Sequence, residues 1–188
     1  MKTLLCKYFL RFVLIMGVII GAACSGDKIP AANPFTLFDF EDEGELDQLH
    51  WECGAMMERD TLHASSGQYS LRIDMYPNQE YPGFKAGFTQ GWHGYNKLTV
   101  DLYNPQATQI KITYRIDDRA DNPPYGDRAQ GSFVLVPGSN TLAVDLENLR
   151  TSGTDRTLAL ARICGLYLFV PRPGHPLTLY LDNVRLER

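Results

Sequence analysis

Several signatures of common enzyme classes are missing from this chain of 188 residues. It has no Gly-x-Ser-x-Gly nucleophile elbow, no phosphate-binding P-loop, no His-Glu-x-x-His zinc motif and no Cys-x-x-Cys pair. Its four histidines are scattered over segments that we expect to be loops and strand ends. These absences argue against the hydrolases, nucleotide-dependent enzymes and thiol oxidoreductases that rely on such motifs.

An excess of basic residues is also missing. The chain has 18 Lys and Arg against 22 Asp and Glu. Three of the cations, Lys2, Lys7 and Arg11, precede residue 24 and no acid does, so a chain that begins at Cys24 has 15 cations, 22 acids and a net charge of −7. An acidic domain without a basic stripe is a poor match to nucleic acid, and we predict no nucleic-acid partner.

No apolar run is long enough to span a bilayer as a helix, which takes about 20 residues. The apolar run of residues 12–23 follows a basic N-terminal region and ends in small residues, which is typical of a secretory signal with its cleavage zone. The stretch after it is rich in Pro, Ala, Ser and Gly. We predict a signal peptide at 1–23, a flexible tether at 24–34 and a folded domain at 35–188.

The end of the signal resembles the bacterial lipobox, in which the cysteine at the first mature position, here Cys24, is lipidated. Gly21 departs from the large aliphatic residue that usually stands three positions earlier. The resemblance implies an exported lipoprotein of the cell envelope, held by its lipid at the outer membrane or at the periplasmic face, and Ser25 is compatible with outer-membrane sorting. Plain secretion and an uncleaved anchor are the alternatives.

Two further cysteines, Cys53 and Cys164, belong to the exported domain. In an oxidising compartment a disulfide between them would close a loop of roughly 110 residues and stabilise the fold by about 4–5 kcal/mol. Two separate buried thiols are the alternative, since a free cysteine behaves as a small apolar residue. The spacing does not decide between them, and the apolar surroundings of Cys164 favour the thiols.

Apolar and polar residues alternate along most of the domain, and no long helical period appears. Turn signals rich in Gly, Pro, Asn and Ser separate the alternating segments. About nine short strands in roughly 150 residues predict an all-β fold, an antiparallel sandwich of two sheets. We expect one short helical turn within 147–162. The best-defined strands are expected at 37–41, 69–75, 97–102, 108–117, 131–136, 140–146, 163–170 and 177–187.

Two of these strands have unusual patterns. Residues 163–170 are apolar at both parities, which predicts a central strand covered on both faces. In the last strand the apolar parity changes at Asp182 and Asn183, which predicts a β-bulge that re-aims one side chain. A last strand covered on both faces is the alternative.

Four short runs resemble the galactose-binding-like β-sandwich, the jelly roll of many carbohydrate-binding modules. The resemblance extends over nearly all of residues 36–188 and depends on the order and spacing of the runs. It implies a jelly-roll domain whose function is binding. The runs are HASSGQYSL at 63–71, WHGY at 92–95, DLYN at 101–104 and LYLDNVRL at 179–186.

The same resemblance implies a structural calcium ion. In such modules a Glu that ends the first strand and an Asp of the last strand join loop carbonyls around the ion. The matching positions here are Glu41 and Asp182, with carbonyls near Ser65 and Gly67. Carboxylates and turn carbonyls are the hard oxygen ligands that calcium prefers. In the alternative, Asp182 caps a bulge and Glu41 is solvated.

Saccharide sites pair aromatic faces with side chains that form forked hydrogen bonds. One strand and the loop after it concentrate such groups, and we predict their ligand-binding residues to be Arg115, Asp117, Asp118, Tyr125, Asp127 and Arg128. An internal salt-bridge network that orders the loop is an equal alternative. Trp92, with Tyr95, is a further stacking candidate, although a place in the core is favoured for both.

These features predict a non-catalytic, envelope-anchored module that binds glycan or polysaccharide. A structural or adaptor lipoprotein that binds another envelope protein is the alternative. A glycoside hydrolase or lyase is less favoured. Asp117 or Asp118 could pair with Asp127 as the two carboxylates that glycosidases need, but the chain has no second domain to build a cleft.

Overall fold

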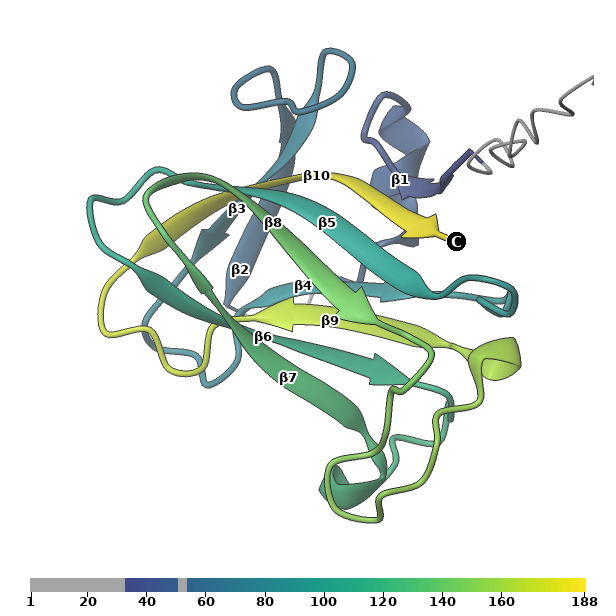
Figure 1. Cartoon of the computed structure of the whole chain (residues 1–188). Helices are drawn as coiled ribbons and strands as arrows, with labels where there is room; N and C mark the ends of the chain where they lie inside the picture. The colour runs from purple at the N-terminus through teal and green to yellow at the C-terminus, as the bar shows by residue number, and fades with distance from the viewer. Residues whose placement is uncertain (1–32, 51–53) are drawn as a thin grey trace, which may run out of the picture. The chain divides into compact units, whose positions relative to one another are not determined.

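Two antiparallel sheets face each other in the computed structural model, which describes residues 33–50 and 54–188 (Figure 1). The larger sheet has the strand order β2–β3–β10–β5–β8, and β1 pairs with β10. Its strands are β1 (Phe35–Phe38), β2 (Ala55–Asp60), β3 (Ser70–Met75), β5 (Lys97–Asn104), β8 (Gly138–Asp145) and β10 (Leu177–Glu187). The smaller sheet has the order β4–β9–β6–β7, with β4 (Gly83–Gly87), β6 (Ile110–Asp117), β7 (Ala129–Leu135) and β9 (Gly165–Phe169). The predicted all-β, two-sheet sandwich is confirmed.

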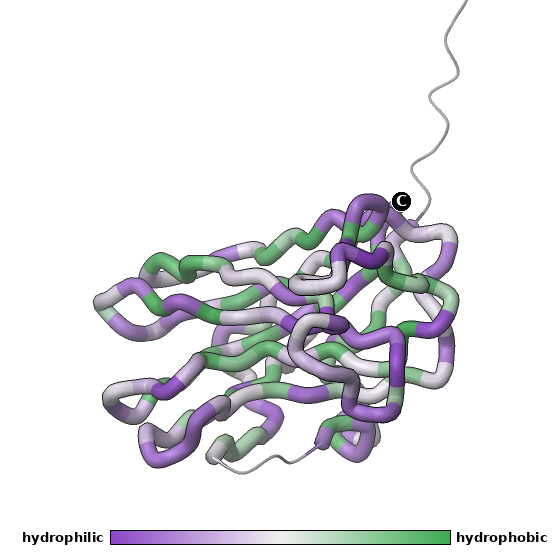
Figure 2. The backbone as a smooth tube through the Cα atoms, turned by 90° about the horizontal axis from the view of Figure 1, so that it is seen from below, coloured by the Kyte–Doolittle hydropathy of each residue, from purple (hydrophilic) through white to green (hydrophobic). Residues whose placement is uncertain are grey.

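The core lies between the sheets and is built by the alternating residues of both. Figure 2 shows hydrophobic residues along the strands and hydrophilic residues in many of the connecting loops. Leu71, Ile116 and Leu166 have no exposed surface. Burying each large apolar side chain contributes about 1.5–3 kcal/mol, so the alternation itself drives the sheets together. Every described strand and core residue lies within 35–188, so a chain that lacks the predicted signal and tether keeps them all.

The last strand, β10, is the structural centre of the larger sheet, because it pairs with β1, β3 and β5. Its register against β5 shifts between Asp182 and Arg185, and Asn183 has a positive φ of 49°. The predicted bulge is therefore confirmed. Leu181 before the shift and Val184 after it are both buried, as the change of parity requires.

Strand β9 lies inside the smaller sheet, between β4 and β6, as predicted for the apolar segment 163–170. Its two faces differ in burial. Leu166 and Leu168 are buried in the core, whereas Tyr167 and Phe169 point to the other face and are only half-buried. The prediction that both faces of this strand are covered is therefore wrong. The outward face of β9 is apolar because it lines a cavity, described below.

Three short 3-10 helices connect strands within the described residues. The predicted turn within 147–162 is confirmed as η3 (Leu160–Arg162), which comes just before β9. The sequence pattern did not indicate the other two, η1 (Glu43–Gln48) and η2 (Tyr125–Asp127). The side chain of Asp42 caps η1 by accepting a hydrogen bond from the amide of Gly44, at 2.9 Å.

Candidate functional site

The outward face of the smaller sheet carries one row of long side chains at matched register. Lys85 of β4 lies opposite Tyr167 of β9, Tyr167 opposite Arg115 of β6, and Arg115 opposite Gln130 of β7. Side chains directly opposite on one face are close enough to interact across strands. The row therefore forms a continuous platform of one aromatic ring, two cations and one amide across four strands.

Cations flank the aromatic ring at the centre of this platform. The Arg115 guanidinium carbon lies 4.4 Å from the centre of the Tyr167 ring, and the Lys85 ammonium lies 4.9 Å from it. Each such contact contributes about 0.5–1 kcal/mol or more as water is excluded. The contacts restrict the conformations of all three side chains and so hold the platform in place before any ligand arrives.

A cavity of about 240 Å³ lies over the platform. Tyr81 and Phe169 form one wall, with their rings edge to face and their centres 5.6 Å apart. Tyr125 and Arg128 also line it, and Tyr125 is 67% exposed. The cavity thus combines exposed aromatic surface with forked hydrogen-bond donors, which is the combination that saccharide recognition uses.

Buried Asp117 fixes the direction of Arg115. Arg115 Nε donates to Asp117 Oδ1 at 2.9 Å, and a second, short hydrogen bond joins Nη2 to Oδ2. The Asp117 side chain is only 4% exposed, and Arg115 engages both of its carboxylate oxygens. Of these two predicted residues, Arg115 lines the cavity, and Asp117 orients the Arg115 side chain without lining the cavity itself.

The loop between β6 and β7 is held by a network of charges. Arg156 donates to Asp118 through two nitrogens, at 2.7 and 2.9 Å, and to Asp127 Oδ1 at 2.9 Å. Arg119 donates to the other oxygen of Asp127 at 3.0 Å. The predicted ligand candidates Asp118 and Asp127 therefore have their oxygens engaged inside the protein, as in the salt-bridge alternative. Arg156, which the sequence analysis did not single out, connects them.

The pKa values of these carboxyls agree with that geometry. Burial acts to raise the pKa of Asp118, but the hydrogen bonds from Arg156 and from the amide of Ala159 outweigh it, so the pKa lies below its ordinary value. The pKa of Asp127 is also lowered, chiefly by its hydrogen bond from Arg156. Both groups are therefore ionised at neutral pH. Neither has the raised pKa of a general acid.

The network fixes the place of η2 and its exposed tyrosine. The amides of Gly153 and Thr154 both donate to the carbonyl of Gly126, each at 2.9 Å. A Cβ on Gly153 would lie 2.8 Å from the Cα of Gly126, so the two loops approach this closely because residue 153 is a glycine. Tyr125 is thereby presented at the rim of the cavity.

Arg128 completes the rim on the same side. Its Nε donates to the carbonyl of Pro123 at 2.6 Å, and its Nη2 donates to Asn122 Oδ1 at 3.1 Å. Both acceptors are neutral, so within the described residues these bonds orient the guanidinium without neutralising its charge. Arg115, Tyr125 and Arg128 are thus the predicted ligand residues that meet at one cavity.

Five residues that form the platform or the cavity wall were not among the predicted ones: Tyr81, Lys85, Gln130, Tyr167 and Phe169. A parity signal was available for the last two, because Tyr167 and Phe169 alternate with Leu166 and Leu168 in β9. No local sequence pattern predicts the strand order β4–β9–β6, which brings Lys85 and Tyr167 close to Arg115.

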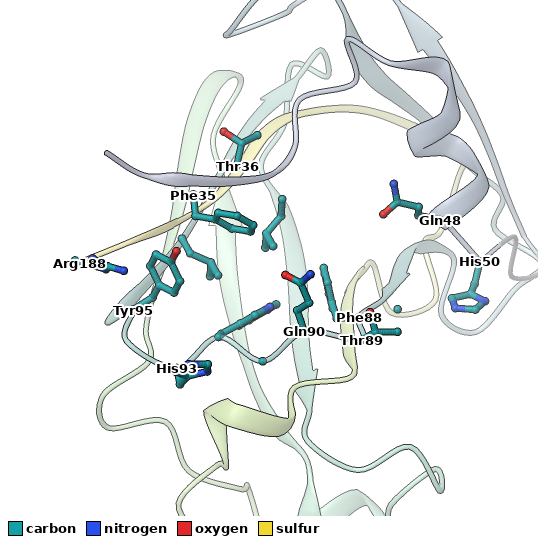
Figure 3. A pocket seen from close by; sticks show the side chains of 15 residues that line it. Phe35, Thr36, Gln48, His50, Phe88, Thr89, Gln90, His93, Tyr95 and Arg188 are labelled. Atoms are coloured by element: carbon teal, nitrogen blue, oxygen red, sulfur yellow. The ribbon is translucent and has the colours of Figure 1, made fainter. Parts of the chain in front are cut away.

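Trp92, the remaining predicted ligand residue, lies in a different part of the molecule. It is 1% exposed and packs edge to face on Phe88, with ring centres 5.2 Å apart. Neither face of its ring is available as an open stacking platform. It lines a second cavity, shown in Figure 3, at the edge of the sandwich.

The two carboxylates predicted to bind calcium, Glu41 and Asp182, both contact the loop that carries Ser65 and Gly67. Asp182 Oδ2 accepts hydrogen bonds from the amides of Ser65 and Ser66 at 2.6 and 2.8 Å, and Oδ1 accepts one from the amide of Asn183 at 2.6 Å. Glu41 Oε1 accepts from two amides of the same loop, those of residues 68 and 69, at 2.7 and 2.8 Å. Gly67 packs against this carboxylate, and its φ is +64°.

In this arrangement the loop presents N–H donors to both carboxylates. A calcium ion needs oxygen ligands directed at it, usually six to eight. No group of three or more His, Cys, Asp and Glu residues suited to a metal occurs within residues 33–50 and 54–188. As arranged, the groups fit a hydrogen-bonded clasp rather than a calcium shell. Calcium binding here stays a prediction from the resemblance.

Some predicted features fall outside the described residues. Cys24 and Cys53 are among them, so lipidation and the disulfide stay predictions. The Cys164 thiol lies 3.4 Å from the carbonyl oxygen of Asp117, and burial, followed by the charges of Asp117 and Asp118, raises its pKa. In the part of the chain that the structure describes, no helix is long and apolar enough to cross a membrane.

No protein-family model matches the sequence, and no curated protein matches it. Solved structures do match the fold. A family 11 carbohydrate-binding module from Clostridium thermocellum, solved with a β-1,3-1,4-mixed-linked tetrasaccharide, is 15% identical with a TM-score of 0.63; the match covers 84% of this chain and 96% of the module. A xylan-binding family 22 module from Paenibacillus barcinonensis is 13% identical with a TM-score of 0.57 and coverages of 84% and 95%.

An exo-β-agarase is 20% identical with a TM-score of 0.63, and the match covers 81% of this chain. This chain spans only 24% of the agarase. The two carbohydrate-binding modules are thus matched over most of both chains, whereas the agarase is matched over only part of its length. At these identities the likeness concerns the fold. The chain has the β-sandwich fold of carbohydrate-binding modules, as its sequence motifs indicated.

Proposed function

We propose that this domain is a non-catalytic module that binds glycan chains on the outward face of the smaller sheet. The single observation that carries the proposal is the row Lys85–Tyr167–Arg115–Gln130 beneath the cavity. The cations and the amide of this row offer forked hydrogen bonds to sugar hydroxyls, and the exposed rings of Tyr81 and Tyr125 at the same cavity offer stacking to a sugar face. The fold shared with the family 11 and family 22 modules supports the same function.

The charges at the site support binding rather than catalysis. A glycosidase needs two opposed carboxylates, one of them with a raised pKa. The three predicted candidates, Asp117, Asp118 and Asp127, each accept hydrogen bonds from an arginine of the same domain. Described residues that line the cavity include no Asp or Glu.

Export and a lipid anchor complete the proposal. The signal-like segment 1–23 and the cysteine at position 24 support a module displayed on the cell envelope by its N-terminal lipid. Metabolic labelling with a fatty acid tests this part. The wild-type chain should take up label, and Cys24→Ser should remain unlabelled and leave the membrane fraction. Equal labelling of both would refute the anchor.

The binding experiment is a titration of the chain 25–188 against immobilised mixed-linked β-glucan, xylan, agarose and an acidic polysaccharide. Tyr125→Ala and Tyr167→Ala remove aromatic surface from the cavity and should each weaken binding about tenfold or more, as loss of a central aromatic contact does. Tyr76→Ala is the matched control, since Tyr76 is exposed outside this cavity. It should bind as the wild type does.

The outcome separates binding at this site from other roles. Saturable binding that falls in both cavity variants and persists in the control establishes the site. Equal binding by all four proteins would move the glycan site elsewhere on the domain. Failure of the folded wild-type chain to bind any of the polysaccharides would refute the proposed function.

A further inference from the structure

A second cavity, of about 680 Å³, lies where β1 and the end of β10 meet the loop between β4 and β5. Small-molecule sites commonly have about 300–1,000 Å³. Figure 3 shows Phe35, Tyr95, His93 and Arg188 toward one end, with Gln48 and His50 at the other. None of its lining residues also lines the cavity over Tyr167.

The loop that forms one side of this cavity is firmly anchored. The amide of Trp92 donates to the carbonyl of Leu160 at 2.7 Å, and the amide of Asn96 donates to that of Glu187 at 2.9 Å. A Cβ on Gly91 would lie 2.3 Å from the carbonyl oxygen of Ala161, so only glycine allows this approach. These backbone contacts shape the cavity before any ligand binds.

One polar atom in the lining lacks a partner. Trp92 is 99% buried, and its indole Nε1 has no hydrogen-bond acceptor among the described residues. A buried N–H without an acceptor costs about 1–3 kcal/mol, and buried indole N–H groups usually have a partner. Nε1 itself has almost no exposed surface, so a neighbouring side chain has to shift before a ligand oxygen reaches it.

The remaining lining indicates the kind of ligand. Phe35 is 46% exposed, and its ring centre lies 6.0 Å from that of Tyr95, so the cavity offers aromatic surface. Gln48, Gln90 and two threonines supply neutral donors and acceptors, and Arg188 adds a cation over the Tyr95 ring, 5.1 Å from its centre. No Asp or Glu occurs among the described lining residues. Aromatic surface with forked hydrogen-bonding groups and no carboxylate suits the apolar face and the hydroxyls of a sugar ring.

We propose that this edge cavity is a second saccharide site, in which a sugar hydroxyl accepts the hydrogen bond from Trp92 Nε1. The inference rests on the proposed function for the class of ligand, but it concerns a different surface. With two separate sites, one domain is able to hold two short saccharides, or two points of a polysaccharide, which raises the overall avidity without new contacts.

Trp92 itself provides the readout. The chain has two tryptophans, Trp51 and Trp92, so Trp51→Phe leaves Trp92 as the only indole. A third cavity, lined among others by His50, Lys85 and Tyr167, adjoins both sites, so a long polysaccharide could occupy both sites at once. Short probes avoid this bridging. Each of four disaccharides is therefore titrated into the Trp51→Phe protein while its tryptophan emission is recorded: cellobiose, laminaribiose, xylobiose and neoagarobiose.

We expect a saturable change in Trp92 emission with at least one disaccharide. Gln90→Ala and His93→Ala change exposed lining residues and should weaken that response about tenfold, equivalent to 1.4 kcal/mol, with unchanged melting temperatures. Tyr167→Ala should leave the response intact. No Trp92 response to any disaccharide, while polysaccharide binding at the Tyr167 site persists, would refute the second site alone.

Two other results would also overturn the assignment. A response that disappears in Tyr167→Ala would mean that Trp92 reports on the first site. A response unchanged in both Gln90→Ala and His93→Ala would place the ligand outside the edge cavity. Failure of the proposed function is a separate result, because it is measured by polysaccharide binding and its dependence on Tyr125 and Tyr167.

Discussion

Replacing Arg156 with Leu tests whether the charge network shapes the rim of the site. Arg156 makes two hydrogen bonds to Asp118, whose side chain is fully buried, and one to Asp127. Leu keeps much of the aliphatic bulk of Arg156 and removes all three bonds. Asp118 would then keep one hydrogen bond, from the amide of Ala159 at 2.8 Å.

The expected loss of stability follows from that geometry. Removing one partner of a buried ion pair costs about 3–5 kcal/mol because the other charge is left buried. Arg156 is 35% exposed, so water enters part of the gap and lowers the cost; we expect about 2–3 kcal/mol. In a domain of this size that corresponds to about 4–12 °C in melting temperature.

Urea and thermal unfolding of the chain 25–188 measure the loss. Arg150→Ala is the matched control, because Arg150 lies on the same loop and pairs with Asp155 at the surface, where both side chains are more than half exposed. It should cost less than about 1 kcal/mol. Arg156→Lys keeps the charge without the forked geometry and should be intermediate. If Arg156→Leu is no less stable than Arg150→Ala, the network does not hold the loop.

Three further predictions concern pH, metal and packing. Folding lowers the pKa of Asp118 below its ordinary value of 3.8, so its contribution to stability is present above pH 3.8 and is lost as the pH falls through the folded pKa. The free energy of unfolding in urea should therefore fall less on acidification in Asp118→Asn than in the wild type. EDTA should leave the melting temperature unchanged, since Asp182 already accepts loop amides; a clear fall would support calcium instead. Gly83→Ala should cost about 1–3 kcal/mol in urea unfolding, because its Cβ would lie 2.1 Å from a backbone carbonyl of β9; an unchanged midpoint would contradict this.

The fold could be predicted from the sequence because its signals are local. Alternation with period two gave the strands, and turn residues gave their ends. The change of parity at Asp182 predicted the bulge in β10, which the register shift confirms. Burial on one face is a property of each strand by itself, so no long-range information was needed to find it.

The site was only partly predictable because it depends on which strands become neighbours. The loop after β6 drew attention through its charges, yet Asp118 and Asp127 pair with Arg156, which lies 38 and 29 residues away in the sequence. Lys85 and Tyr167 reach Arg115 only through the pairing of β4, β9 and β6. A list of charged residues does not tell which ones neutralise each other.

The charged residues of the loop therefore pair with one another and order the loop, although their number suggests that they bind a ligand directly. A flexible aromatic at a rim loses conformational entropy when it binds a ligand, about 0.5–1.5 kcal/mol per ordered side chain, and more if the loop itself is ordered then. Here the carboxylates and arginines order the loop during folding. Tyr125 is left exposed at the end of an ordered support, with Arg115 and Arg128 already oriented beside it. If the proposed function holds, these ion pairs support binding without touching the ligand, and the Arg156→Leu variant should weaken glycan affinity even though Arg156 lies outside the cavity lining.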